Sequence, residues 1–297
     1  MKKFGIFLAV CFGISLLSAG LFHFLGGDYA SVIGSLFASA YMFIPLVSVV
    51  LTQLLVGEKP FHRTGVSFKF NRWWIVALFS MPLFCLLTLP VSAIFPGVSI
   101  DLNGPLMMKT VDQMAAAGLK TGPIGVLAIT MVSGLIAGLT INAVFAFGEE
   151  IAWRGFLARC LDSLGFWRKS LLIGAAWGAW HAPLILMGHN YPSHPVSGVF
   201  MMIAFCILLT PVFMLLREKA GSMIVAAIAH GTMNAVAGIA LMCLDGYDEM
   251  LCGACGLAGM LILAVTDLVI FLVFREYREP EPGIHISQRP RPRGGLL

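Results

Sequence analysis

The chain has 297 residues, of which 59% are hydrophobic and only 11% are charged, and its mean hydropathy is +0.90. Water-soluble domains carry roughly 25% charged residues, so this chain has too few of them to cover a globule in water. The composition excludes a soluble enzyme. At roughly 20 apolar residues per bilayer crossing, it allows about six to nine membrane helices.

Several apolar runs are long enough to cross a bilayer, and we expect each of them to be a membrane helix. They extend over about residues 4–25, 29–56, 73–95, 124–147, 171–187, 199–216, 223–244 and 250–274. The sequence therefore predicts an all-α integral membrane protein, a polytopic bundle of about eight transmembrane helices.

The basic residues indicate how these helices are oriented. If the N-terminus is cytosolic, the cytosolic side holds every one of the 19 Lys and Arg residues except Lys109 and Lys120. Because cytosolic loops of membrane proteins carry an excess of Lys and Arg, we expect both ends of the chain to be cytosolic. We also expect a multi-pass protein of a bacterial plasma membrane that contacts membrane lipids and no nucleic acid.

The chain divides into four segments. Residues 1–123 form the N-terminal transmembrane helices and loops, residues 124–244 hold the polar motifs described below, and residues 245–275 form the final transmembrane helix. Residues 276–297 alternate charges with prolines and lack an apolar period. Such a segment cannot bury enough apolar surface to fold, so we expect a disordered cytosolic tail.

The remaining cysteines and polar residues give weaker signals. Cys252 and Cys255 form a lone CxxC, with no second pair to complete a tetrahedral zinc site. His189 and His194 follow the fifth apolar run, where we expect ordinary loop residues. Asp267 lies inside the last run without a predicted partner.

Three groups of polar residues lie inside the apolar runs, where an ionisable side chain costs at least about 2.5 to 3.5 kcal/mol. They are Glu149, Glu150 and Arg154 in segment 147–157, His181 in segment 177–183, and His230 and Asn234 in segment 230–234. That cost demands a partner or a use for each group.

Helical spacing predicts how the polar residues face one another. Glu150 and Arg154 are four residues apart with the acid first, which favours an ion pair on one helix face. Glu149 is turned about 100° from Glu150 and faces a different neighbour. His230 and Asn234 share a face. At 1.5 Å per residue the three groups lie about 14 to 18 Å from the cytosolic interface, near the middle of a core about 30 Å thick.

The fourth apolar run raises a difficulty of length. Helix continued from Ile124 to Arg159 would be too long for one untilted span. We therefore expect its outer end to protrude, or the helix to break at Gly134, Gly138 or Gly148.

These polar residues are suited to hydrolysis inside a membrane. No HExxH helix of a zinc protease is present, and no Gly-x-Ser-Gly or Gly-x-Gly-Asp. What remains is a carboxylate to act as general base on water, histidines to hold the water or a metal, and an Asn to donate to an oxyanion. A structural ion-pair network and a proton-coupled membrane transporter are the alternatives, although a transporter would usually show repeated halves.

Taken in order, the motifs Glu149-Glu150-x-x-x-Arg154, aromatic-x-x-x-His181 and His230-x-x-x-Asn234 resemble those of the CAAX prenyl protease type II family. This family is also called the CPBP (CAAX protease and bacteriocin-processing) intramembrane proteases. Segment 124–244 would then form CAAX-protease-like catalytic helices. The resemblance implies a hydrolase that cuts a peptide bond near the C-terminus of a membrane-associated or prenylated substrate. A catalytically silent scaffold or immunity protein of the same fold is the alternative.

The resemblance also implies a role for each motif residue. By it, Glu149 and Glu150 match the paired acids, with Glu149 activating water, and Arg154 orients the acids. His181 shares the water or a metal. His230 and Asn234 resemble an oxyanion-stabilising pair. If one divalent metal such as zinc is used, its ligands are Glu149, His181 and His230, and a metal-free hydrolysis stays open.

Two aromatic positions depart from the family pattern. Trp177 stands where the family usually has Phe, and Trp153 replaces a frequent Phe next to Arg154. We expect both to be packing changes that leave the chemistry intact.

Overall fold

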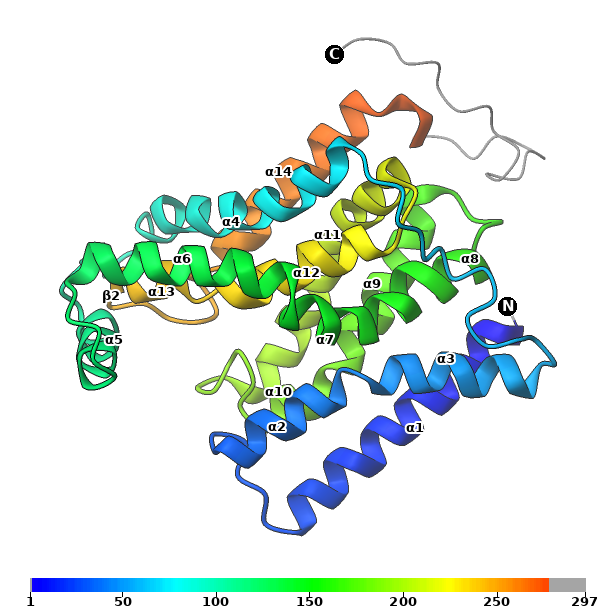
Figure 1. Ribbon diagram of the computed structural model, residues 1–297, viewed down its shortest axis with the longest axis horizontal. Helices are drawn as coiled ribbons and strands as arrows, with labels where there is room; N and C mark the ends of the chain where they lie inside the picture. The colour runs from blue at the N-terminus through cyan, green and yellow to red at the C-terminus, as the bar shows by residue number, and fades with distance from the viewer. Residues whose placement is uncertain (1, 278–297) are drawn as a thin grey trace.

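The computed structural model describes residues 2–277 and shows an almost entirely α-helical chain (Figure 1). Its elements are, in order, α1 (Lys2–Phe24), α2 (Val32–Tyr41), α3 (Ile44–Leu55), α4 (Arg72–Ser92), β1 (Ser99–Ile100), α5 (Pro105–Ala116), α6 (Pro123–Leu139), α7 (Ile141–Glu150), the π-helix η1 (Ile151–Leu157), α8 (Ala158–Cys160), α9 (Phe166–Trp180), α10 (Ala182–Leu186), α11 (Pro195–Ala220), α12 (Ile224–Val236), α13 (Ile239–Met242), β2 (Leu244–Asp245), α14 (Leu257–Val273) and the 3₁₀ turn η2 (Arg275–Tyr277). The predicted all-α membrane fold is confirmed. The predicted tail lies outside the described residues from 278 onward, whereas Glu276 and Tyr277 belong to η2.

Within residues 2–277, 5 helices are long and apolar enough to cross a membrane, or up to 6 if the bent pair of α6 and α7 is one span. The five are Lys2–Phe24, Val32–Leu55, Arg72–Ser92, Pro195–Ala220 and Ile224–Met242. Two predicted spans are shorter, because α9 ends after 15 residues and α14 has 17. The polytopic architecture is therefore confirmed, and the count of eight and the cytosolic placement of both ends stay predictions.

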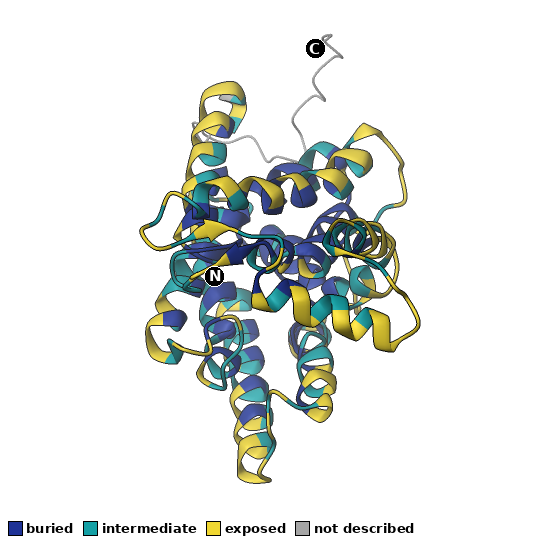
Figure 2. Ribbon diagram, turned by 90° about the vertical axis from the view of Figure 1, so that its left-hand side faces the viewer, coloured by how far each residue is buried: buried dark blue, intermediate teal, exposed yellow. Residues whose placement is uncertain are grey.

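Helix α12 lies at the centre of the bundle, where it packs against α4, α6, α7 and α11 (Figure 1). Helix α11 packs along α9, and α1 packs on α3 at one side of the bundle. Buried residues face the interior, and exposed residues face outward (Figure 2). The outward faces carry large apolar side chains such as Leu17, Ile124 and Phe200, which is the surface that lipid tails require.

Glycines allow the central helices to approach at backbone distance. A Cβ atom on Gly178 of α9 would lie 2.5 Å from Ile203 Cα on α11. One on Gly231 of α12 would lie 2.7 Å from Ala143 N on α7. Small residues at such positions let membrane helices pack closely. Helices α7, α9 and α12, which carry the polar motifs, are thereby brought into the same core.

The long fourth run bends by 50° between α6 and α7. The break lies at Thr140, whose backbone has φ −122° and ψ −104°, so the predicted break at a glycine is wrong. Gly134 and Gly138 instead lie against α12, and Gly148 lies against Met42, where added Cβ atoms would collide with neighbouring atoms. These glycines allow helices to pack closely. The sequence alone does not distinguish this role of a glycine from that of a break in the helix.

A small layer at one end of the bundle was not predicted. It consists of α5 and the antiparallel pair β1 and β2, with Ser99 opposite Asp245 and Ile100 opposite Leu244. The last helix also starts later than predicted, at Leu257, because the preceding residues form turns.

The contact of Gly231 with α7 leads to a stability prediction. Gly231→Ala should lower the free energy of unfolding by about 1 to 3 kcal/mol, the usual cost of overpacking. The added methyl group would meet backbone atoms of α7, which cannot move aside as a side chain could. The measurement is thermal unfolding of the purified protein in detergent.

Gly238→Ala is the matched control, since nothing lies within 4 Å of a Cβ atom added there. It should change the stability by no more than about 0.5 kcal/mol. Equal midpoints of thermal unfolding for Gly231→Ala and Gly238→Ala would contradict the close packing of α12 on α7.

Candidate active site

The acidic motif lies at a change of helix type. Glu149 and Glu150 are the last two residues of α7, and Arg154 lies in the π-helical turn η1 that follows. Every residue of η1 is buried. Turns of this type are rare and frequently occur at functional sites. Gly155 lets the loop between α3 and α4 pass close to η1. A Cβ atom on Gly155 would lie 2.6 Å from the carbonyl oxygen of Thr64 in that loop.

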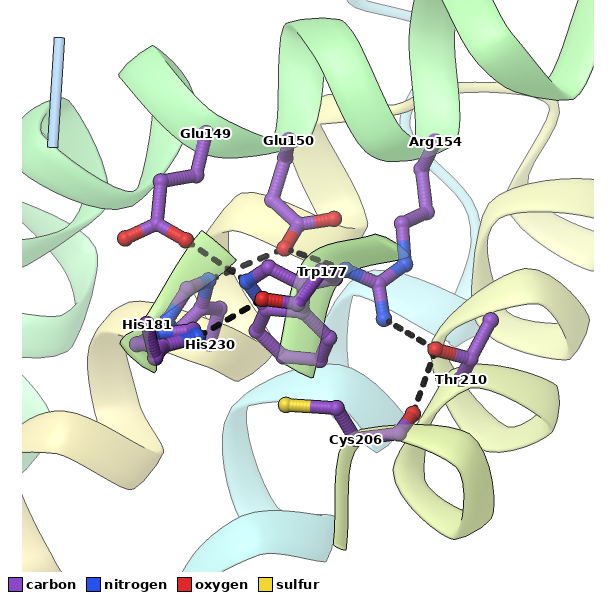
Figure 3. Close-up of polar contacts among 8 residues, drawn as sticks. All are labelled: Glu149, Glu150, Arg154, Trp177, His181, Cys206, Thr210 and His230. Atoms are coloured by element: carbon purple, nitrogen blue, oxygen red, sulfur yellow. Dashed lines mark hydrogen bonds and ion pairs between the residues drawn. The ribbon is translucent and has the colours of Figure 1, made fainter. Parts of the chain in front are cut away.

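Glu150 and Arg154 form the ion pair that their spacing predicts. Arg154 Nη1 donates to Glu150 Oε1 at 2.9 Å, and both side chains are 0% exposed. The same oxygen lies 2.9 Å from His230 Nδ1 (Figure 3). Arg154 Nη2 also donates to Thr210 Oγ1 at 3.1 Å, a partner that the sequence did not reveal. Because buried charges need paired and hydrogen-bonded surroundings, these contacts make the acid and the guanidinium tolerable in the core.

Trp177 on α9 contacts all three motifs. Its Nε1 donates to Glu149 Oε2 at 2.7 Å, and its carbonyl oxygen lies 2.8 Å from His181 Nδ1. Arg154 Cζ lies 4.2 Å from the centre of the indole, a cation–π distance. The indole also meets the His230 ring edge to face, with centroids 5.3 Å apart. Trp177 is therefore more than the packing change that the sequence suggested.

The hydrogen bonds of the two histidines bear on which ring nitrogen carries the proton. A carbonyl oxygen only accepts, so the contact with Trp177 requires a proton on His181 Nδ1 and leaves the lone pair on Nε2. Glu150 Oε1, which already accepts from Arg154, likewise accepts from His230 Nδ1 when that nitrogen carries the proton. His181 is placed by the break between α9 and α10, because proline at the start of α10 cannot continue α9. In the neutral form of each ring, the acceptor is then Nε2.

Accessibility separates the polar residues into two sets. Glu150 and Arg154 are completely enclosed. The exposed fraction is 2% for Glu149, 9% for His181 and 4% for the His230 side chain. The enclosed pair can hold the site together, and the marginally accessible three can meet a small molecule such as water.

Asn234 is not part of this hydrogen-bonded cluster. It lies one turn after His230 on α12, as the spacing predicts, but it is exposed. No hydrogen bond connects it to the cluster among residues 2–277. The structure thus joins Glu149, Glu150, Arg154, His181 and His230, and it leaves Asn234 at the edge.

The metal prediction can be compared with the donor atoms. Two imidazoles and a carboxylate are the donor types of a catalytic zinc shell. In the described part of the chain, however, the group whose ligand atoms all lie within 4.8 Å of one another is His194, Asp248 and Glu249. The predicted ligands, Glu149, His181 and His230, do not form such a group. A metal held by these three residues stays a prediction, and no step of the reaction proposed below is assigned to a metal.

The acidic group beside His194 has a structural explanation. His194 Nε2 lies 2.9 Å from Asp248 Oδ2, and the backbone N–H of Ser193 donates to Glu249 at 2.6 Å. Partial burial raises the pKa of Asp248, but its hydrogen bonds with His194 and the Met250 N–H outweigh this and lower the pKa overall. These contacts join two loops.

The other polar residues noted in the sequence lie away from the cluster. His189 Nδ1 lies 2.8 Å from the hydroxyl of Tyr29, which links two loops as expected of loop residues. Cys252 and Cys255 are free thiols. Asp267 Oδ1 is buried, and no side chain among the described residues partners it.

The fold and the site together define a polytopic membrane protein with a carboxylate–histidine site in its core. Residues 131–236 match the family described as "Type II CAAX prenyl endopeptidase Rce1-like". The matched segment contains all six predicted site residues. The resemblance that the motifs indicated is thereby confirmed.

A curated relative supports the same resemblance. The chain is 25% identical over 170 residues to "CAAX prenyl protease 2" of Methanococcus maripaludis. The alignment covers 56% of this chain and 58% of that relative. The chain is therefore similar to CAAX-type endopeptidases, and it spans little more than half the length of this curated relative.

The buried ion pair gives the first prediction about the site. Arg154→Met should lower the free energy of unfolding by about 3 to 5 kcal/mol, because it leaves the Glu150 carboxylate buried and unpaired. The double variant Glu150→Gln with Arg154→Met should be more stable than Arg154→Met alone. Unfolding in detergent measures both differences.

Arg168→Met is the control, because Arg168 lies on α9 but is exposed. Its stability should stay within about 0.5 kcal/mol of the wild type. If the double variant is no more stable than Arg154→Met alone, the interpretation of Glu150 and Arg154 as a buried ion pair is wrong.

Proposed function

We propose that the chain is an intramembrane endopeptidase of the CAAX prenyl protease type, in which Glu149 activates water. The observation that carries this proposal is the division of the acid pair. Glu150 is enclosed with Arg154, whereas Glu149 is marginally accessible and lies with His181 and His230 around Trp177. A base for water needs this combination of burial, accessibility and orientation.

The hydrolytic step follows from the free atoms of the site. Glu149 Oε2 accepts from Trp177, so Oε1 is the oxygen left to take a proton from water. The Nε2 lone pair of either His181 or His230 would accept the other hydrogen of that water. The water oxygen then forms a bond to the peptide carbonyl carbon, the C–N bond breaks, and Glu149 returns the proton to the leaving amine.

The developing oxyanion requires donors rather than acceptors. His230 Nδ1 lies against Glu150, so Nε2 can donate only when the ring carries two protons. The Asn234 amide donates in any protonation state. We therefore assign the oxyanion contact to Asn234, which the substrate would reach at the edge of the cluster.

The proposed substrate is a membrane-associated or prenylated protein cut near its C-terminus from the cytosolic side. This part of the proposal rests on the resemblance and on the name of the methanogen relative. The site lies inside a bundle whose outward faces are apolar, so a substrate held in the bilayer would reach it laterally. The proposal places the protein in a bacterial plasma membrane, in contact with lipids.

The role of Glu149 is tested by Glu149→Gln. Gln retains an acceptor for Trp177 but cannot take a proton, so cleavage should slow by at least about 10² to 10⁴, the contribution of a general base. The substrate is a peptide that ends in a prenylated CAAX sequence, with its unprenylated form in parallel, and mass spectrometry detects the product.

Glu249→Gln is the matched control, because that carboxylate lies in a loop with Ser193 and away from the cluster. It should cleave at the wild-type rate. Wild-type turnover by Glu149→Gln would refute the assignment. If the wild-type protein cut the prenylated and the unprenylated peptide at the same rate, the proposal that the substrate is prenylated would be wrong.

Zinc dependence gives a separate prediction. Because Glu149, His181 and His230 do not gather their ligand atoms within 4.8 Å, cleavage should persist after dialysis against a strong chelator. Loss of activity that zinc restores, together with zinc in the purified protein at one ion per chain, would favour the metal mechanism instead.

A further inference from the structure

The carboxylate of Glu149 has a different set of partners from that of Glu150. Two donors meet Glu150 at Oε1, one from Arg154 and one from His230. In the described part of the chain, the donor to Glu149 is the indole N–H of Trp177, at 2.7 Å from Oε2. The orientation of the proposed base therefore depends on one side chain from another helix.

The chemistry of indole makes this contact directional. Nε1–H is a donor and never an acceptor, so it can hold a carboxylate oxygen but cannot compete for the proton that the base must take. The hydrogen bond from Trp177 engages Oε2 and leaves Oε1 without this donor (Figure 3). A base held in this way needs no reorientation before proton transfer.

The indole is itself held in place on several sides. Arg154 Cζ lies 4.2 Å from its centre, and the centroids of Phe213 and His230 lie 6.1 Å and 5.3 Å away. Its accessible fraction is only 2%. The enclosed pair of Arg154 and Glu150 thus contacts the indole that orients Glu149.

We propose that Trp177 is a positioning residue, whose indole N–H holds Glu149 Oε2 so that Oε1 faces the attacking water. The proposal rests on the proposed function of Glu149. Phe keeps an aromatic ring that can pack with Phe213 and His230 but lacks the N–H donor, so the Phe variant should fold.

The test compares Trp177→Phe with Trp180→Phe. Both residues lie on α9 and are buried, but Trp180 Nε1 donates to Ser15 Oγ at 2.7 Å rather than to an acid. Trp177→Phe should lower kcat about 10- to 100-fold, as expected from losing a hydrogen bond to a charged group, and leave KM unchanged. Trp180→Phe should retain the wild-type kcat.

A second comparison separates positioning from a structural role. The thermal midpoint should fall in both variants, because each loses one indole donor to a buried acceptor. In a Glu149→Gln background, Trp177→Phe should cause no further loss of single-turnover rate, since the group it orients is already inactive.

The outcomes distinguish the inference from the proposed function. The inference is overturned if Trp177→Phe and Trp180→Phe have the same kcat. It is also overturned if Trp177→Phe slows the Glu149→Gln variant by the same factor by which it slows the wild-type protein. Wild-type cleavage by Glu149→Gln would instead overturn the proposed function, and the inference with it.

Discussion

The buried ion pair of Glu150 and Arg154 is the contact on which the rest of the site depends. Two carboxylates and a guanidinium within a mostly apolar bundle would be strongly unfavourable without mutual compensation. Arg154 supplies it to Glu150 directly, and the same guanidinium lies on the indole of Trp177. His230 joins from α12 through the same Glu150 oxygen. Three helices are thereby connected by one pair of charges.

This pairing explains why two adjacent acids can have different roles. The 100° rotation between neighbouring residues of a helix turns Glu149 away from the ion pair. Glu149 is then left with a neutral donor, Trp177, and with marginal accessibility. Glu149 has no cation of its own and is marginally accessible, whereas Glu150 binds Arg154 and His230 through Oε1 and keeps Oε2 fully enclosed. The close packing at Gly178 and Gly231 keeps these distances short.

Much of this arrangement could be predicted from the sequence. Ionisable residues in apolar runs indicated the site, the four-residue spacing of Glu150 and Arg154 predicted their pair, and helical rise predicted a common depth. The features that could not be predicted depend on contacts between helices. The bend at Thr140, the indole donor of Trp177 and the outlying position of Asn234 follow from neighbours across the bundle, which spacing within one helix does not specify.

The most direct test of the account is an experimental density map of the protein in lipid with a bound, uncleavable substrate peptide. The account predicts one ordered water within hydrogen-bond distance of Glu149 Oε1 and of Nε2 of His181 or His230, with Trp177 still on Oε2. A map in which Glu149 points away from both histidines, or in which these side chains face lipid, would contradict it.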